Sequence, residues 1–373
     1  MENSLDSREF PTPGQPAPIR RAYIDWLRGI AVLFMIEWHT VDAWNADPER
    51  ARTVFATLAY IGGWAAPLFL FLAGVAVPLA AASHARKGRS SREAAWALQK
   101  RGWQIFVIAH LFRLQSFILN PWARIDSIFK PDILNILGLG LVVAAWCWGR
   151  SARLTRRLAW LLLPAGAIVL LTPLSREWGW PTMLHLRLEA YIRPNGGWGV
   201  FTIFPWLAYV LVGAAVGVWL VQPRAASREP LFHALLALAG LGVIAAGFLG
   251  SSLPSLTPAS QGGSTFSYFV SRNGIMMVAL AATWWLLETP GAQRMTRWWG
   301  PVLTFGRTSL FVYWIHVELA YGFFSTAWKR SMTIEEWSLA YVAFTAMLYW
   351  AAAWWAKRTT TPWVPGHLKS TKA

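Results

Sequence analysis

Long uninterrupted apolar blocks run through this 373-residue chain and restrict what it can fold into. Each block approaches the roughly 20 residues that an α-helix needs to cross the hydrocarbon core of a bilayer. Only 14% of the residues are charged, whereas a soluble domain carries about a quarter. We therefore predict an all-α fold, a polytopic membrane bundle of about ten transmembrane helices. The expected spans are 22–44, 55–82, 98–119, 133–149, 158–174, 200–221, 231–251, 266–287, 302–325 and 337–356.

We interpret the net charge of +16 as an indication of how the chain is oriented in the membrane. In a soluble protein such an excess would suggest nucleic acid, but here the basic residues cluster between apolar blocks. Lys and Arg number 21 in the even-numbered loops and the termini, against ten in the odd-numbered loops. Since basic loops stay in the cytoplasm, both termini are expected there. The expected partner of these cations is the lipid bilayer, and no nucleic acid is expected.

The segments outside the spans are short. Residues 1–21 are polar and proline-rich and lack the apolar core of a signal peptide, so we expect a disordered cytoplasmic tail. Residues 22–357 would form one transmembrane domain, and residues 358–373 a short basic cytoplasmic tail. The single cysteine, Cys147, leaves no intramolecular disulfide, Cys-based zinc site or redox pair.

Ionisable side chains inside the predicted spans are candidates for a functional site, because burying a charge in lipid is costly unless it faces a polar cavity or a partner. They are Arg28, Glu37, His39, His110, Arg113, Arg272, Arg307, His316 and Glu318, with Asp25 at the inner mouth. The alternative is that some of them only brace helices through buried hydrogen bonds.

The first span carries a polar stripe. Asp25, Arg28, His39 and Asp42 follow helical spacing, so they lie along one face. His39 comes eleven residues after Arg28, which is about 16 Å along a helix axis. The stripe therefore combines a cation at the inner mouth with an imidazole in the outer half of the membrane.

Depth in the membrane sorts the remaining candidates into two groups. Arg101 and Arg307 are expected at the inner ends of their spans, together with Arg28. A polar cluster in the outer half would then face these cations across a site open to both sides. Its members are His39, Arg113, Arg272 and His316, with His110 one turn from Arg113. Depth alone does not say which helices touch.

Four strings in order resemble a known superfamily. IDWLRGIAVLFMIEWH is similar to the opening helix of transmembrane acyltransferases, which share an Asp-x-x-Arg-Gly start. APLFLFLAGVAVPLA, FTIFPWLAYVLVGAAVG and FGRTSLFVYWIH resemble the heparan-α-glucosaminide N-acetyltransferase-like branch. The resemblance runs from Asp25 to about residue 325. It implies a ten-helix bundle that moves an acetyl or other short acyl group from cytoplasmic acetyl-CoA. The acceptor implied is a hydroxyl or amine of a carbohydrate or glycolipid on the far side of the membrane, with no metal.

The resemblance also implies roles for individual residues. His39 stands at the place of a histidine of the related acyltransferase-3 branch, whereas the heparan branch has its catalytic histidine in the loop after the first span. This chain has no histidine between His39 and His84. His39 is thus the expected catalyst, and Asp42, one turn outward, is expected to orient its ring. We assign Arg28, Arg101 and Arg307 to the CoA phosphates, and Asp25 to a structural pairing with Arg28. The substrate-binding candidates are His110, Arg113, Arg272 and His316.

Several alternatives stay open. The imidazole can act as a general base or can accept the acyl group itself in a covalent intermediate. Pro67, Pro78 and Pro205 would also suit the broken helices of a secondary transporter of a small polar solute, and His39, His110 and His316 are potential haem ligands. We expect an integral protein of the bacterial inner membrane. The acceptor, O- versus N-transfer and assembly as a homo-oligomer are open.

Overall fold

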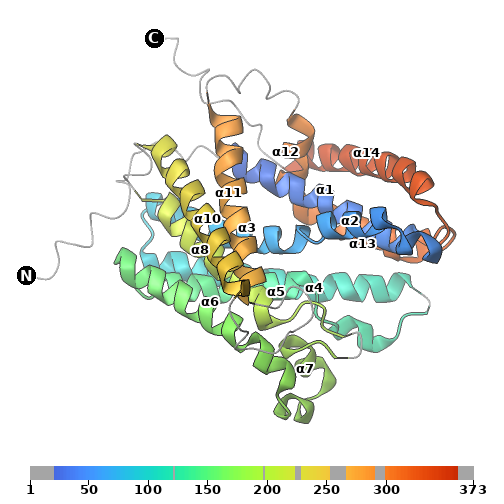
Figure 1. Ribbon diagram of the computed structural model, residues 1–373, viewed down its shortest axis with the longest axis horizontal. Helices are drawn as coiled ribbons and strands as arrows, with labels where there is room; N and C mark the ends of the chain where they lie inside the picture. The colour runs from blue at the N-terminus through green and yellow to red at the C-terminus, as the bar shows by residue number, and fades with distance from the viewer. Residues whose placement is uncertain are drawn as a thin grey trace, which may run out of the picture. The chain divides into compact units, whose positions relative to one another are not determined.

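The computed structural model describes residues 21–120, 122–195, 198–222, 228–252, 266–289 and 299–359. Within these ranges the regular secondary structure is helical, apart from two isolated β-bridges, so the predicted all-α membrane bundle is confirmed. Figure 1 gives the order of the elements. The expected tails, residues 1–21 and 358–373, fall almost entirely outside the described residues.

Eight described helical segments are long and apolar enough to cross a membrane. They are Thr53–Arg86, Ser91–Leu119, Ile125–Trp148, Leu154–Glu177, Ile203–Leu220, Glu229–Gly250, Phe266–Glu288 and Ile334–Thr359. These match eight of the ten expected spans. The other two, 22–44 and 302–325, are helical as well. The first carries several charges, and the second is interrupted at Thr308, which explains why neither reaches the same hydropathy over an unbroken length.

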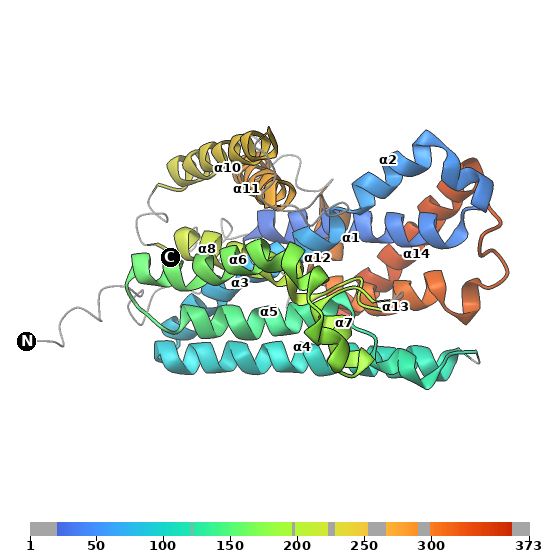
Figure 2. The ribbon, with the colours of Figure 1, turned by 60° about the horizontal axis from the view of Figure 1, so that its bottom comes forward.

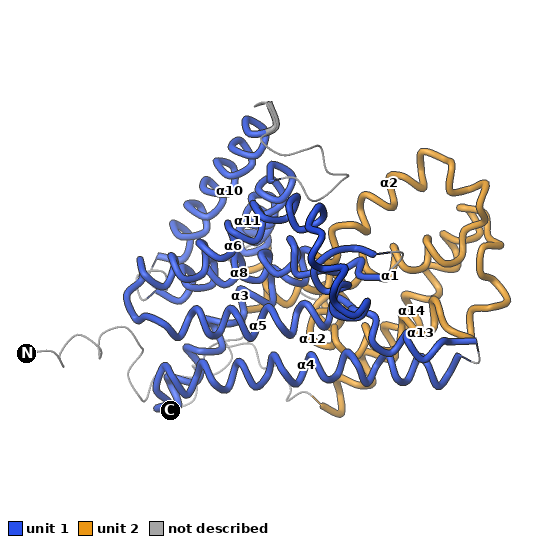
Figure 3. The backbone as a smooth tube through the Cα atoms, turned by 90° about the horizontal axis from the view of Figure 1, so that it is seen from below, with its two compact units in different colours: residues 1–16, 67–285 blue, residues 17–66, 286–373 orange. Residues whose placement is uncertain are grey.

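The chain divides into two compact units, coloured separately in Figure 3. Unit 2 is made of residues 17–66 and 286–373, two stretches that lie far apart in the sequence. Unit 1 contains the middle of the chain, residues 67–285.

Unit 2 holds the polar stripe. Its helices are α1 (Ala22–Trp44), η2 (Asp47–Ala51), α2 (Thr53–Gly62), α12 (Gly300–Arg307), α13 (Ser309–Tyr321), η6 (Phe323–Ser325) and α14 (Ile334–Thr359). The expected ninth span is thus two helices, because Thr308 leaves helical backbone geometry between α12 and α13. The expected second span is also divided, since α2 ends at Gly62 and α3 begins at Ala65.

Two glycines bring α1 and α12 into backbone contact. A Cβ atom on Gly29 would lie 2.0 Å from the carbonyl oxygen of Val302, and one on Gly306 would lie 1.7 Å from that of Asp25. Both distances are far below van der Waals contact, so only glycine fits. Small residues that let two backbones approach are typical of membrane helix crossings.

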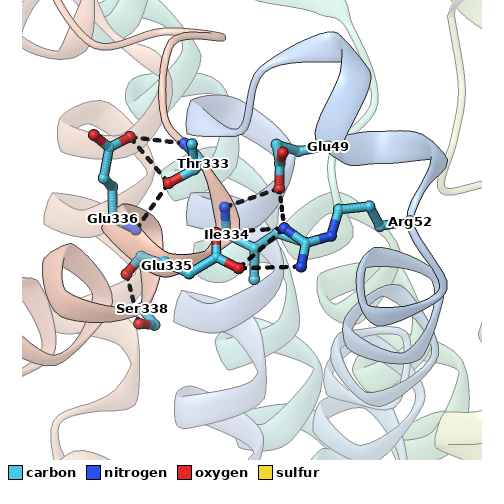
Figure 4. A network of polar contacts seen from close by, with 7 residues as sticks. All are labelled: Glu49, Arg52, Thr333, Ile334, Glu335, Glu336 and Ser338. Carbon is cyan, nitrogen blue, oxygen red and sulfur yellow. Dashed lines mark hydrogen bonds and ion pairs between the residues drawn. The ribbon is translucent and has the colours of Figure 1, made fainter.

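Charged contacts join two connections of unit 2 (Figure 4). Arg52 follows η2 and pairs with Glu49 at 2.6 Å and with Glu335 of α14 at 3.0 Å. A carboxylate oxygen of Glu49 also accepts a hydrogen bond from the backbone N–H of Ile334. Glu49 therefore satisfies one of the unpaired N–H groups at the start of α14. This fastens the segment after α1 to the first turn of α14.

Unit 1 is a bundle built around α4 and α5, which lie side by side in Figure 2. Its helices are α3 (Ala65–Arg86, from Pro67 on), α4 (Ser91–Leu119), η3 (Ile125–Phe129), α5 (Ile133–Trp148), α6 (Leu154–Glu177), η4 (Trp180–Met183), α7 (Leu186–Ile192), α8 (Ile203–Leu220), α10 (Glu229–Ser252) and α11 (Phe266–Glu288). Helix α3 packs closely on α8, since a Cβ on Gly213 would lie 2.0 Å from the carbonyl oxygen of Phe71.

Candidate active site

Two intramembrane histidines contact each other in unit 2. Nδ1 of His39, on α1, lies 2.8 Å from Nε2 of His316, on α13. His316 is fully buried, whereas His39 keeps partial exposure. We refer to His39 and His316 as the histidine pair. The sequence placed both side chains in the same half of the membrane, and the structure joins them.

Two tyrosine rings of α13 flank the pair. The ring of Tyr321 meets His39 edge-on, with ring centroids 5.4 Å apart. Tyr313 approaches His316 in the same manner, at 5.9 Å. Such edge-to-face contacts restrict how each imidazole can rotate.

Asp42 contacts residues other than His39. One carboxylate oxygen accepts a hydrogen bond from the Tyr321 hydroxyl at 2.8 Å, and the other pairs with Arg50 at 2.9 Å. Arg50 also donates to the Asp42 backbone carbonyl. The group hydrogen-bonded to the His39 ring is His316, whereas we expected Asp42 to orient this ring. Asp42 instead accepts a hydrogen bond from Tyr321, and the ring of Tyr321 contacts the His39 ring.

Three residues form an arginine–aspartate cluster near the start of α1. One carboxylate oxygen of Asp25 lies 3.3 Å from Nη1 of Arg28, and the other lies 3.8 Å from Nε of Arg307. Asp25 is buried, and the two guanidinium groups are about one-fifth exposed. The expected pairing of Asp25 with Arg28 is present, and Arg307 joins it.

His110 and Arg113 lie together in unit 1, in a network on α4 and α5. Nδ1 of His110 lies 3.2 Å from the carbonyl oxygen of Ile128, and Nε2 lies 3.3 Å from the side-chain amide of Asn135. Arg113 pairs with Asp132 at 2.9 Å. Both ring nitrogens of His110 are therefore engaged in holding the connection before α5.

The other two candidates also belong to unit 1. Arg272, on α11, is buried and places its guanidinium group 4.4 Å from the ring centre of Tyr268. Arg101, on α4, is exposed and donates to Gln104 at 3.5 Å. Of the outer-half candidates, the structure brings His39 and His316 into direct contact, whereas His110 and Arg113 are linked only through Asn135 and Asp132.

Sequence reasoning missed several partners of these groups. Tyr321, Arg50 and Asp132 complete the networks around the predicted residues. Only Asp132 could have been found from the sequence. Its side chain accepts a hydrogen bond from the backbone N–H of Ile133 at the start of α5. An Asp before an apolar run is a recognisable helix start. Among the described residues, His, Cys, Asp and Glu form no group of three that could hold a metal ion.

A family model described as heparan-alpha-glucosaminide N-acetyltransferase, catalytic, matches residues 20–246. The match covers more than half of the chain. A comparison with curated proteins gives no match. His39, Arg28 and Asp25 lie inside the matched range, whereas His316 and Arg307 lie beyond it.

Proposed function

The chain belongs to the heparan-α-glucosaminide N-acetyltransferase catalytic family, and from this we propose that it transfers an acetyl group from cytoplasmic acetyl-CoA to a sugar-type acceptor. Its helices support a membrane enzyme of this kind. The observation that carries the proposal for this chain is the histidine pair. It places on the first membrane helix an imidazole that is hydrogen-bonded at Nδ1 and has no hydrogen bond at Nε2 to the described residues.

We propose His39 as the catalytic residue. Its hydrogen bond to His316 uses Nδ1, which leaves Nε2 for the substrate. As the acceptor oxygen or nitrogen attacks the thioester carbonyl, Nε2 takes its proton. The C–S bond then breaks, and the CoA thiolate takes this proton from Nε2–H of His39, which regenerates the neutral imidazole. In the other route Nε2 attacks the carbonyl itself and CoA leaves as the thiolate. The acceptor then attacks the acetylated ring, which releases His39, and gives up the proton that the thiolate gains.

The arginine–aspartate cluster is the proposed donor site within unit 2. Guanidinium groups bind phosphate oxygens through paired, charge-assisted hydrogen bonds. Asp25 pairs with both Arg28 and Arg307 and so holds the two guanidinium groups together. The eleven residues from Arg28 to His39 span about 16 Å of helix, a length comparable to an extended pantetheine arm. Arg101 belongs to unit 1, and its role as a phosphate contact stays a prediction from the sequence.

The proposed acceptor contacts are His110, Arg113, Arg272 and His316. For Arg113 there is one supporting observation, because its buried Nε atom has no hydrogen-bond partner within the described residues. A sugar hydroxyl could accept from that N–H. For His316, the contact with His39 supports a different role, which is developed below.

The test uses the whole protein, purified in detergent, with radiolabelled acetyl-CoA and either glucosamine or glucose as acceptor. We expect release of CoA and label in the sugar, and loss of both in His39→Ala. The His39→Ala protein should still bind acetyl-CoA. Intact thioester with every sugar tried, together with flux of a solute into proteoliposomes, would overturn the enzyme and favour the transporter.

A further inference from the structure

The two rings of the histidine pair lie almost in one plane. Their planes differ by 10°, and their centroids are 5.0 Å apart. The two hydrogen-bonded nitrogen atoms are 2.8 Å apart. The distance between the ring centroids is therefore longer than the distance between the nitrogens by close to two ring radii. This is possible only if both nitrogens lie near the line between the ring centres. The contact is thus an edge-to-edge N–H···N hydrogen bond with good alignment, and not a face-to-face stack.

The other nitrogen of His316 fixes the direction of this bond. Nδ1 of His316 lies 2.8 Å from the carbonyl oxygen of Val312, one turn earlier on α13. A carbonyl oxygen only accepts hydrogen bonds, so Nδ1 must carry the proton. In a neutral imidazole the second nitrogen then has the lone pair, and Nε2 of His316 is an acceptor. His39 must donate to it from Nδ1, which places the lone pair of His39 on Nε2.

We propose that His316 is a positioning residue that holds His39 in the tautomer with its lone pair on Nε2. The inference deepens the proposed function, since this is the nitrogen that would meet the acceptor or the thioester. When Nε2 takes a proton, Nδ1–H of His39 keeps its acceptor, and the hydrogen bond becomes charge-assisted. A neutral imidazole thus does what a carboxylate does in a serine-type triad. His316 lies beyond the range of the family match, so the comparison assigns it no role.

His316 could also act only as a structural brace between α1 and α13. The chain contains a matched control residue for this alternative. His233, on α10, is equally buried, and its Nδ1 lies 2.9 Å from the carbonyl oxygen of Glu229, again one turn earlier. Its ring stacks on Trp284 and contacts no histidine among the described residues. His233→Gln therefore tests the loss of a buried, back-bonded imidazole without touching the histidine pair.

The activity test compares His316→Leu, His316→Gln and His316→Glu with His233→Gln. We expect His316→Leu to lower kcat by about 10²-fold or more with KM for acetyl-CoA nearly unchanged, as loss of an orienting partner does. Gln places an acceptor near the position of Nε2 and should recover part of this loss. Combining His316→Leu with His39→Ala should cost no more than His39→Ala alone, because the two residues act as one unit. The positioning role would be overturned if the kcat losses of His316→Leu and His39→Ala multiplied in the double variant. It would also be overturned if His233→Gln lost as much kcat as His316→Leu.

The His316→Glu variant gives a readout that a structural brace would not move. A carboxylate beside His39 favours its protonated form, so the pH at which activity falls on the acid side should rise by about one to three units. An unchanged acid limb in an active His316→Glu protein would count against the proposal.

A nitrogen NMR spectrum of ¹⁵N-histidine-labelled protein separates this inference from the proposed function. It should show His39 protonated at Nδ1 in the wild type and a mixture of tautomers in His316→Leu. A wild-type His39 protonated at Nε2 would overturn the inference whatever the activity. The expected tautomer in a protein without acetyl transfer would instead refute the proposed function alone.

Discussion

The close crossing of α1 and α12 makes a strong prediction for Gly306→Ala. The new Cβ atom would lie 1.7 Å from the carbonyl oxygen of Asp25, half of the shortest ordinary contact of 3.4–4 Å. The obstructing atom belongs to the backbone, so no side chain can rotate away. The two helices must separate, and the arginine–aspartate cluster, which bridges them, must separate with them.

Two terms of opposite sign set the size of the effect. Alanine is favoured over glycine inside a helix by about 1 kcal/mol. Overpacking a tight contact costs about 1–3 kcal/mol, and we take the upper end because the clash is with backbone. The expected result is a net loss of about 2 kcal/mol in the free energy of unfolding, if the two terms add. Unfolding in mixed micelles with rising SDS measures this quantity.

Gly300→Ala is the matched control on the same helix. A Cβ atom at Gly300, the first residue of α12, meets nothing within 4 Å. This variant should therefore be neutral or slightly more stable than the wild type. If Gly306→Ala stabilises the protein as Gly300→Ala does, the close crossing of α1 and α12 is refuted.

Three further predictions concern the proposed chemistry and the topology. His39→Gln should lose about as much acetyl transfer as His39→Ala, roughly 10²–10⁴-fold, because an amide cannot take a proton at neutral pH; substantial transfer by the Gln variant would contradict the catalytic role. Arg28→Ala should raise the Kd for acetyl-CoA, measured by isothermal titration, more than it lowers kcat at saturation. Strong coupling with Asp25→Ala in a double-mutant cycle of stability, at unchanged donor affinity, would make Arg28 structural. Reporter fusions after residues 90 and 155 should report cytoplasm and those after 47 and 260 the far side, and a cytoplasmic signal at 260 would break the ten-helix topology.

Hydropathy predicted the spans well because lipid is the solvent for most of these side chains. Even the short span at 133–149 and the one containing Pro164 are helices. What hydropathy missed are the breaks inside apolar runs, at residues 63–64 and at Thr308. Both breaks fall at residues that favour an interruption, the Gly62–Gly63 pair and the polar run from Arg307 to Ser309. Mean hydropathy over a whole span averages such short interruptions away.

The candidate site was predictable in its residues but not in its contacts. Charged groups within a membrane span are candidates for a site because burying a charge in lipid costs free energy. Helical spacing then placed His39 and Asp42 on one face of the first span. Whether Asp42 or His316 reaches the His39 ring depends on which helix lies beside α1. The periodicity of one helix contains no information on which helix packs beside it. Asp42 is an example, since its two partners, Arg50 and Tyr321, both lie outside α1.

The contacts inside unit 2 support the predicted topology by a separate argument. Arg28 and Arg307 meet at Asp25, and His39 and His316 meet further along, so α1 and the α12–α13 segment run in the same direction. Two membrane helices are parallel only if an odd number of crossings separates them. Seven of the apolar helical segments lie between α1 and α12 along the chain, Thr53–Arg86 being the first and Phe266–Glu288 the last. If each of them crosses once, α12–α13 is the ninth span, as the hydropathy predicted. With α14 as the tenth, both termini would lie on one side, as the distribution of Lys and Arg independently indicates.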